Sequence, residues 1–198
     1  LVIAHRGASA IAPENTIVAF ELVVKHHADA IEFDVKLSSD REVVIIHDST
    51  VNRTTNGIGK VSGLSLSEMQ QLDAGRKFEE SYSGEKIPSL RDVFEQLGKR
   101  IRMNIELTNY STPNDGLVEE VVKAVKEFNL EENIIFSSFF VRNLSLAERL
   151  IPEIPRGLLA YPGWLGAIAR IRSLNKKYQA LHPNIKDIND RLVSMTHA

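Results

Sequence analysis

The alternation of short apolar runs with longer helical patterns is the feature that most limits what this chain can fold into. Seven runs of strand length follow one another, and a segment with helical spacing of its apolar residues comes after most of them. Strand-then-helix order is typical of a parallel sheet covered by helices. The expected strands cover residues 1–7, 29–38, 42–48, 102–108, 133–139, 156–161 and 178–184.

The helical segments between these runs carry start signals or an apolar face. One helix is expected to start at Asn15 and Thr16, and Ser89 is the expected N-cap of another. Further helices are expected over residues 88–99, 116–128, 141–150, 164–178 and 185–197. Seven strand units are too many for a flavodoxin-like sheet, and they predict a TIM (β/α)8 barrel whose eighth strand is absent from this sequence. We expect residues 1–198 to form one barrel domain.

Residues 48–87 interrupt this alternation after the third expected strand. The segment has about forty residues, contains the turn signal Asn56-Gly57, and holds one short helix, for which Ser65 and Glu68 are spaced as a capping box. Loops at the C-terminal ends of barrel strands build the binding sites of this architecture. We therefore expect an insertion that covers the mouth of the barrel, the alternative being a loop with no part in binding.

The composition excludes several classes of protein. The 198 residues carry a formal net charge of −2, which gives no general attraction to nucleic acid, and they include no cysteine, which excludes disulfides and thiolate metal sites. No apolar run approaches the length of a membrane-spanning helix. No signal peptide is recognisable, so a cytoplasmic location is favoured.

Three acidic residues on two expected strands are placed to meet. Alternate residues of a strand share a face, so Glu32 and Asp34 point together from the second strand, and Glu106 points from the fourth. The opposite faces are apolar and belong against helices, which directs the carboxylates into the barrel mouth. Together they predict an oxygen-only site for a hard divalent cation such as Mg²⁺, Ca²⁺ or Mn²⁺. The alternative is a salt-bridged trio with Arg6 or Arg102.

Two histidines stand at the ends of apolar runs. His5 ends the first expected strand and His47 the third, and the alternative for either one is a structural hydrogen-bonding role. Imidazoles are the natural acid and base pair near neutral pH. Arg6 adds a guanidinium fork that suits phosphate, and Gly7 is expected to let the backbone approach a ligand. With a divalent ion, these residues predict phosphoryl transfer, with the phosphate bound at the end of the first strand.

Three further residues are weaker candidates for lining the pocket. His182 ends the seventh expected strand, Tyr110 follows the fourth, and Trp164 follows the sixth. For Trp164, packing in the core is the alternative, because it also fits the apolar face of its helix.

Several stretches together resemble the glycerophosphodiester phosphodiesterase family. They are "HRGASAIAPENT", "ADAIEFDVKLSSDREVVIIHD", "RTTNGIGKVSGLSLSEMQQLDAG", "KIPSLRDVF", "MNIEL" and "ALHPN", and they run from the first expected strand to the seventh. The resemblance implies a TIM barrel with a small insertion after the third strand. It also implies hydrolysis of small-molecule glycerophosphodiesters to glycerol 3-phosphate and an alcohol, with Mg²⁺ or Ca²⁺.

The resemblance further implies a role for each site residue. His5 and His47 would be the general acid and base, Arg6 the phosphate ligand, and Glu32, Asp34 and Glu106 the metal ligands. In the implied route a glycerol hydroxyl attacks the phosphorus, and water then opens a cyclic phosphodiester. The insertion would shape the pocket for the glycerol end.

Two features depart from the family's pattern. Many members have a lysine two residues after the last metal-binding glutamate, where this chain has Thr108, so a positive charge near the phosphate is absent or supplied from elsewhere. The family's final strand, with its Trp-Thr-Val-Asn-like stretch, is not in this sequence. Either the sequence is truncated or the barrel is open, and open strand edges favour oligomerisation or poor solubility.

Other functions stay open at this point. A related barrel phospholipase, of lysophospholipase D or sphingomyelinase D type, is one alternative, although the insertion argues against the sphingomyelinase D type. A catalytically inactive phosphate-binding barrel is another, although the complete set of acidic and histidine residues argues against it. No basic stripe supports binding to nucleic acid.

Overall fold

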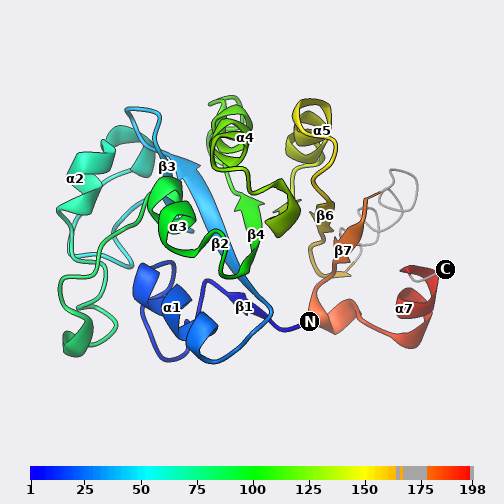
Figure 1. Ribbon diagram of the computed structural model, residues 1–198, viewed down its shortest axis with the longest axis horizontal. Coiled ribbons are helices and arrows are strands. Elements are labelled where there is room, and N and C mark those ends of the chain that lie inside the picture. The colour runs from blue at the N-terminus through cyan, green and yellow to red at the C-terminus, as the bar shows by residue number, and fades with distance from the viewer. Residues whose placement is uncertain (164–165, 167–177, 197–198) are drawn as a thin grey trace. The chain divides into compact units, whose positions relative to one another are not determined.

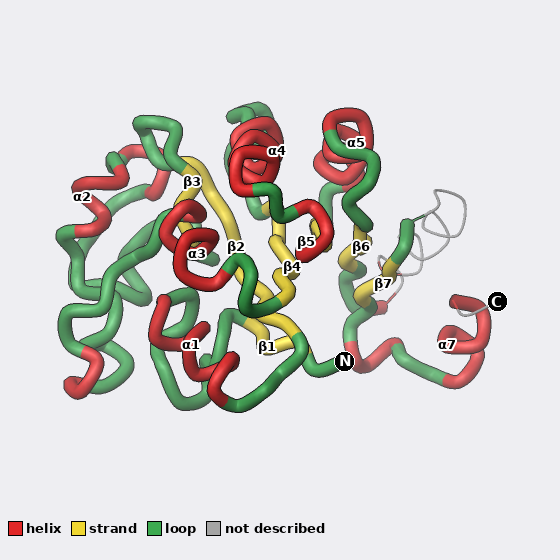
Figure 2. Tube along the Cα trace, in the orientation of Figure 1, coloured by secondary structure: helices red, strands yellow, loops and turns green. Residues whose placement is uncertain are grey.

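The computed structural model describes residues 1–163, 166 and 178–196, and the chain divides into two compact units, Leu1–Ile134 and Ile135–Ala198. Figures 1 and 2 show short strands alternating with helices through both units, as the sequence pattern predicts. Among the described helices, none is long and apolar enough to cross a bilayer.

Parallel strands form the centre of the first unit. They are β1 (Ile3–His5), β2 (Ala30–Leu37) and β4 (Arg102–Leu107), and β2 lies between the other two. The register aligns His5 with Glu32, and Asp34 with Glu106. All eight residues of β2 are buried, so polar side chains on this strand are held inside the protein. The register therefore brings the ends of three strands, and the polar residues on them, to one place.

The third strand runs antiparallel to β2 and not, as expected from the sequence, parallel to it. β3 (Val43–Ile45) pairs antiparallel with β2, with Val35 opposite Ile45. The connection over residues 38–42 has the Ser38 amide donating to the Glu42 carbonyl, a short hairpin turn. A parallel pair would need a crossover of a dozen or more residues, which this connection lacks. The expectation of a parallel third strand is therefore wrong, and the described part of the first unit has three parallel strands.

Helices cover the apolar face of this sheet. They are α1 (Ile17–Lys25), α3 (Leu90–Leu97) and α4 (Leu117–Phe128). Thr16 caps α1 through its side-chain oxygen, and Ser89 caps α3 in a capping box with Asp92. The expected helix start at Asn15 and Thr16 and the expected cap Ser89 are therefore confirmed. The ring of Phe20 on α1 packs on that of Phe33 on β2, with the centroids 5.5 Å apart. The apolar side of β2 thus faces a helix, which leaves its other side for polar residues.

The insertion over residues 48–87 shares a small hydrophobic core with β3. It contains η1 (Val61–Gly63), α2 (Leu66–Gln70) and η2 (Glu80–Tyr82), and α2 begins with the expected capping box of Ser65 and Glu68. Its core consists of Val44, Ile46, Val51, Val61, Met69, Ala74 and Ile87. Tyr82 Oη donates to the Ile11 carbonyl at 2.8 Å, which ties the insertion to the loop between β1 and α1.

The second unit repeats the strand-and-helix arrangement. Its parallel strands are β5 (Ile134–Ser138), β6 (Arg156–Leu159) and β7 (Ala180–His182). The described helical segments are α5 (Val141–Leu150), η4 (Ile185–Asp187) and α7 (Asp190–Thr196). Most of the helix expected over residues 164–178, with Trp164, lies outside the described residues.

Candidate active site

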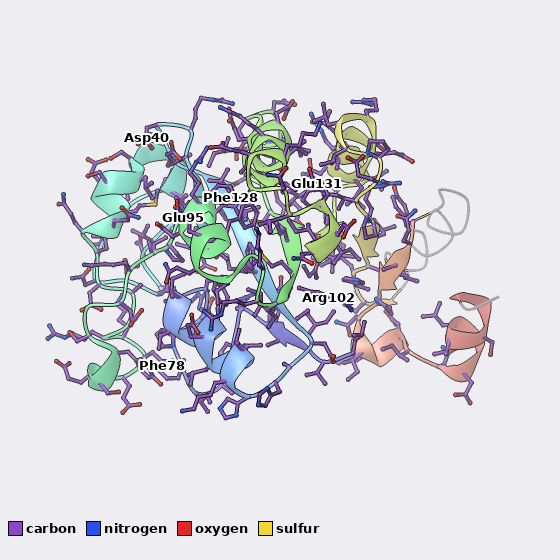
Figure 3. The ribbon with its side chains drawn as sticks, viewed as in Figure 1. Asp40, Phe78, Glu95, Arg102, Phe128 and Glu131 are labelled. Carbon is purple, nitrogen blue, oxygen red and sulfur yellow. The ribbon has the colours of Figure 1, made fainter. Side chains whose placement is uncertain are left out.

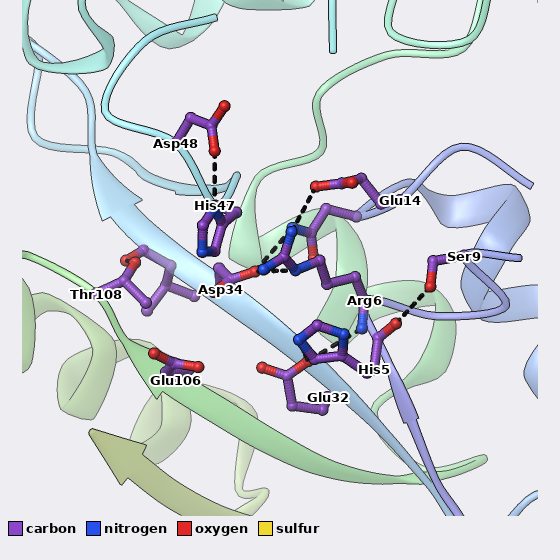
Figure 4. Close-up of polar contacts among 12 residues, drawn as sticks. His5, Arg6, Ser9, Glu14, Glu32, Asp34, His47, Asp48, Glu106 and Thr108 are labelled. Atoms are coloured by element: carbon purple, nitrogen blue, oxygen red, sulfur yellow. Dashed lines mark hydrogen bonds and ion pairs between the residues drawn. The ribbon is translucent and has the colours of Figure 1, made fainter. Parts of the chain in front are cut away.

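Three carboxylates meet where β2 and β4 lie side by side. Asp34 and Glu106 are direct neighbours in the register, and Glu32 lies two residues before Asp34 on the same face. One oxygen from each residue lies within 4.8 Å of the others (Figure 4). We call these three residues the carboxylate cluster. The alternative partner Arg102 is exposed at the start of β4 (Figure 3).

In Glu32 and in Asp34, one carboxylate oxygen accepts a hydrogen bond and the other accepts none within the described residues. The backbone N–H of Arg6 donates to Glu32 Oε2 at 3.0 Å, and Asn15 Nδ2 donates to Asp34 Oδ2 at 3.0 Å. Within the described part of the chain, the buried oxygens Glu32 Oε1 and Asp34 Oδ1 have no hydrogen-bond partner. A buried acceptor without a donor is costly, and a cation bound between these oxygens would satisfy both.

The raised pKa values of the cluster carboxyls also favour a bound cation. Burial and the neighbouring charges of Asp34 and Glu106 raise the pKa of Glu32 to about 9. Burial and Asp34 raise the pKa of Glu106 to about 7, although Tyr110 Oη donates to Glu106 Oε1 at 2.9 Å and opposes the rise. A divalent ion would offset this repulsion and keep the carboxylates ionised. The donor set therefore fits a hard cation.

Arg6 lies beside the cluster at the end of β1. Its Nε is 3.3 Å from Asp34 Oδ2, and its Nη1 donates to Glu14 Oε1 at 3.1 Å. The guanidinium is thus fixed between two carboxylates next to the expected metal site. This arrangement suits a phosphate held between a cation and Arg6.

Gly7 lies where the chain after Arg6 packs against α1. Its φ of +81° is in the left-handed region, and a Cβ added there would lie 2.8 Å from the Cβ of Ala19 and 2.9 Å from Cδ1 of Phe20. Glycine is therefore required because α1 packs directly against the chain after Arg6. The expectation that the backbone at Gly7 approaches a ligand stays a prediction.

The two histidines come from different strand ends and are both exposed. His5 Nε2 lies 3.9 Å from Glu32 Oε2, and partial burial together with the charge of Arg6 lowers the pKa of His5. His47 follows β3, and its Nδ1 lies 2.7 Å from Asp48 Oδ1. Figure 4 shows both rings beside the cluster. A His5 that is neutral near pH 7 can accept a proton, and a His47 oriented by Asp48 can donate one from Nε2.

An ion-pair network that the sequence analysis missed connects the two sides of the site. Arg53, in the insertion, donates from Nη1 and Nη2 to Glu14 at 2.9 and 2.8 Å. It also donates from Nε and Nη2 to Asp48 at 2.7 and 3.1 Å. The Arg53 guanidinium holds the pKa of Asp48 down at about 2. Asp48 then contacts His47 and Glu14 contacts Arg6, so Arg53 links a histidine to the expected phosphate ligand.

A cavity of about 150 Å³ lies between the β1–α1 loop and the insertion. Its lining includes Ser9, Pro13 and Glu14 from the loop, and Arg53, Lys77 and Phe78 from the insertion. Because Glu14 and Arg53 belong to the same network as Arg6 and His47, the insertion borders the region of the cluster.

The three weaker candidates have different positions. Tyr110 contacts the cluster through Glu106. His182 ends β7 in the second unit, where its ring lies over Gly157 and burial lowers its pKa. Trp164 lies outside the described residues.

Comparisons with known proteins agree on one family. The family model described as "Glycerophosphoryl diester phosphodiesterase family" matches residues 5–198. A glycerophosphodiester phosphodiesterase from Caldanaerobacter subterraneus subsp. tengcongensis is 43% identical over 98% of this chain and 79% of its own length. One from Bacillus altitudinis is 34% identical over 100% of this chain and 81% of its own.

Solved structures give the same result for the fold. An Oleispira antarctica phosphodiesterase, in complex with the product sn-glycerol-3-phosphate, matches with a TM-score of 0.83 at 35% identity, over 99% of this chain and 79% of that one. A glycerophosphodiester phosphodiesterase from Agrobacterium tumefaciens matches with a TM-score of 0.80 at 28% identity, over 98% and 81%. These matches confirm the α/β TIM-barrel class expected from the alternation of strands and helices.

Proposed function

Since the chain belongs to the glycerophosphoryl diester phosphodiesterase family and is a phosphoric diester hydrolase of that kind, we propose that it works by metal-dependent catalysis with two histidines. The substrate would be a glycerophosphodiester, and the products glycerol 3-phosphate and an alcohol. The observation that supports this proposal most strongly is the buried carboxylate cluster with His5 and His47 beside it.

Glu32, Asp34 and Glu106 would hold the divalent ion, Mg²⁺ or Ca²⁺. When bound, the ion supplies positive charge that stabilises the charge developing on the phosphate oxygens. Arg6 lies next to Asp34, so its guanidinium would bind the same phosphate group from the side of β1. The cation and Arg6 together would orient the phosphorus toward the two imidazoles.

The histidines would divide the proton transfers between them. His5, whose pKa is lowered, accepts the proton of a glycerol hydroxyl as that oxygen attacks the phosphorus. His47, with Nδ1 held by Asp48, gives its Nε2 proton to the oxygen of the departing alcohol. The product of this step is a cyclic phosphodiester. Water then opens it, with its proton passing to His47, while His5 returns its proton to the glycerol oxygen.

The test is release of glycerol 3-phosphate from glycerophosphocholine and glycerophosphoethanolamine, with Mg²⁺, with Ca²⁺ and with chelator. We expect release to require the ion, and His5→Ala and His47→Ala to lower kcat about 10²- to 10⁴-fold each. His26→Ala is the matched control, because His26 is exposed at the end of α1 and lies outside the site. Release that survives chelator, or that is equal in all three alanine variants, would overturn the proposal.

A further inference from the structure

Lys36 places a buried ammonium directly beyond the carboxylate cluster. Alternate residues of a strand share a face, so Glu32, Asp34 and Lys36 form one row along β2. Lys36 is only 8% exposed. Its Nζ donates to the Thr108 carbonyl at 2.6 Å and to Thr108 Oγ1 at 3.1 Å. The ammonium is therefore fixed in one position.

The strand register determines where along β2 and β4 the Lys36 ammonium lies. Asp34 aligns with Glu106, and Val35 with Leu107, so Lys36 and Thr108 meet at the next level toward the C-terminal ends of β2 and β4. Thr108 Oγ1 donates its own proton to the Val35 carbonyl at 2.7 Å, which turns a lone pair toward Lys36. The C-terminal ends of parallel strands are where barrels bind their substrates. A ligand above the cluster would therefore lie at the level of the Lys36 ammonium.

The partners of Lys36 explain why its charge is available. Both of its hydrogen-bond acceptors are uncharged oxygens of Thr108. Among the residues that the structure describes, Lys36 forms no ion pair that compensates its burial, and its hydrogen bonds go to Thr108. A buried ammonium whose hydrogen-bond partners are uncharged oxygens points to an anionic ligand.

We propose that Lys36 binds the phosphate group of the substrate and supplies the positive charge that Thr108 does not. The inference rests on the proposed function, because it takes the phosphate to lie over the carboxylate cluster. The ammonium comes from β2 and is held in place by the residue that faces it on β4. The side chain that replaces Lys36 should then determine how tightly the site holds a phosphate monoester.

Binding of glycerol 3-phosphate, measured by titration calorimetry with and without Mg²⁺, is the primary test. Hydrogen bonds to charged groups are worth enough that Lys36→Met should weaken binding about 10- to 100-fold, with kcat/KM falling by a similar factor. Lys99→Met is the matched control, because Lys99 is exposed before the start of β4, and it should leave both values unchanged. Adding Thr108→Lys to Lys36→Met returns an ammonium from the neighbouring strand and should recover about tenfold of the loss.

Two further comparisons separate a phosphate ligand from a structural tie between strands. Lys36→Arg keeps the charge and Lys36→Gln removes it, while both alter the shape. Weaker binding in the glutamine variant than in the arginine variant, at matched melting temperatures, supports the proposal. Equal binding in these two variants, or wild-type binding in Lys36→Met, would overturn it. Failure of the wild type to release glycerol 3-phosphate would count against the proposed function instead, and the binding comparison would still decide the role of Lys36.

Discussion

Arg53 donates hydrogen bonds from Nε and Nη2 to the two carboxylate oxygens of Asp48, at 2.7 and 3.1 Å. The same guanidinium holds Glu14, which in turn holds Arg6. Only a planar guanidinium can donate to both Asp48 and Glu14 in this way, and the ammonium of a lysine cannot reproduce the arrangement. The orientation of His47, which depends on Asp48, is therefore coupled to a residue of the insertion.

Replacing Arg53 should affect the chemical step more than substrate binding. In Arg53→Met, Asp48 loses its partner and His47 loses its fixed orientation, so kcat should fall about 100-fold while KM changes only a few-fold. Arg53→Lys should recover part of this loss, because it restores charge without the fork. The control is Arg76→Met, since the side chain of Arg76 pairs with Glu80 at an exposed position in the same insertion. Equal kinetics for Arg53→Met and Arg76→Met would contradict the coupling.

Tyr110 should tune the affinity of the carboxylate cluster for its ion. Its hydroxyl donates to Glu106 Oε1 at 2.9 Å, and such contacts orient a metal-binding carboxylate. Tyr110→Phe should weaken binding of Mg²⁺ or Ca²⁺ about tenfold, measured by calorimetry. Tyr82→Phe removes a hydroxyl bonded to the Ile11 carbonyl, away from the cluster, and should leave metal affinity unchanged. A cluster that binds the ion equally well in both variants would rule out this role for Tyr110.

Gly7 should be required for stable packing of α1 against the chain after Arg6. Gly7→Ala forces a Cβ to within 2.8 Å of Ala19 Cβ at a positive φ, so it should destabilise the fold by about 2–4 kcal/mol. Gly63→Ala is the matched control, because a Cβ there meets nothing within 4 Å, and it should change stability by less than about 0.5 kcal/mol. Urea denaturation measures both. A Gly7→Ala variant as stable as Gly63→Ala would show that α1 can move away from β1.

The sequence predicted the faces of the strands well because their period is short and local. Glu32, Asp34 and Glu106 alternate with apolar residues, which predicts their faces. The local pattern did not determine whether β2 and β4 are neighbours in the sheet. The caps at Thr16 and Ser89 were predictable for the same reason, since each acts within its own helical turn.

The features that sequence reasoning missed are the direction of a strand and contacts between residues far apart in the sequence. The orientation of β3 was readable in principle, because only a few polar residues separate the expected strands 29–38 and 42–48, which is the length of a hairpin. The pairing of Arg53 with Glu14 was not readable, because 39 positions separate them and either residue could have been a solvated surface charge. Likewise, nothing local shows that Lys36 would meet Thr108.

Without its ion, the protein should lose stability as the pH rises. The pKa of Glu32 is raised to about 9 and that of Glu106 to about 7, so the folded state holds protons on these carboxyls that the unfolded chain releases above about pH 4.5. The stability that comes from these protons is full below the unfolded pKa and is lost as the pH passes through the folded values. In chelator, the melting temperature should therefore fall between about pH 5 and pH 9.

Mg²⁺ or Ca²⁺ should reverse this trend, because the bound ion stabilises the ionised carboxylates and binding releases protons. Glu106→Gln in chelator should flatten the slope between about pH 5 and pH 7, where Glu106 would titrate. Glu95→Gln changes an exposed glutamate on α3 and should keep the wild-type slope. Scanning calorimetry across this pH range checks all three curves. A wild-type melting temperature that stays constant in chelator would mean that the cluster is already ionised without metal, and the argument for a cation between Glu32 and Asp34 would lose its electrostatic support.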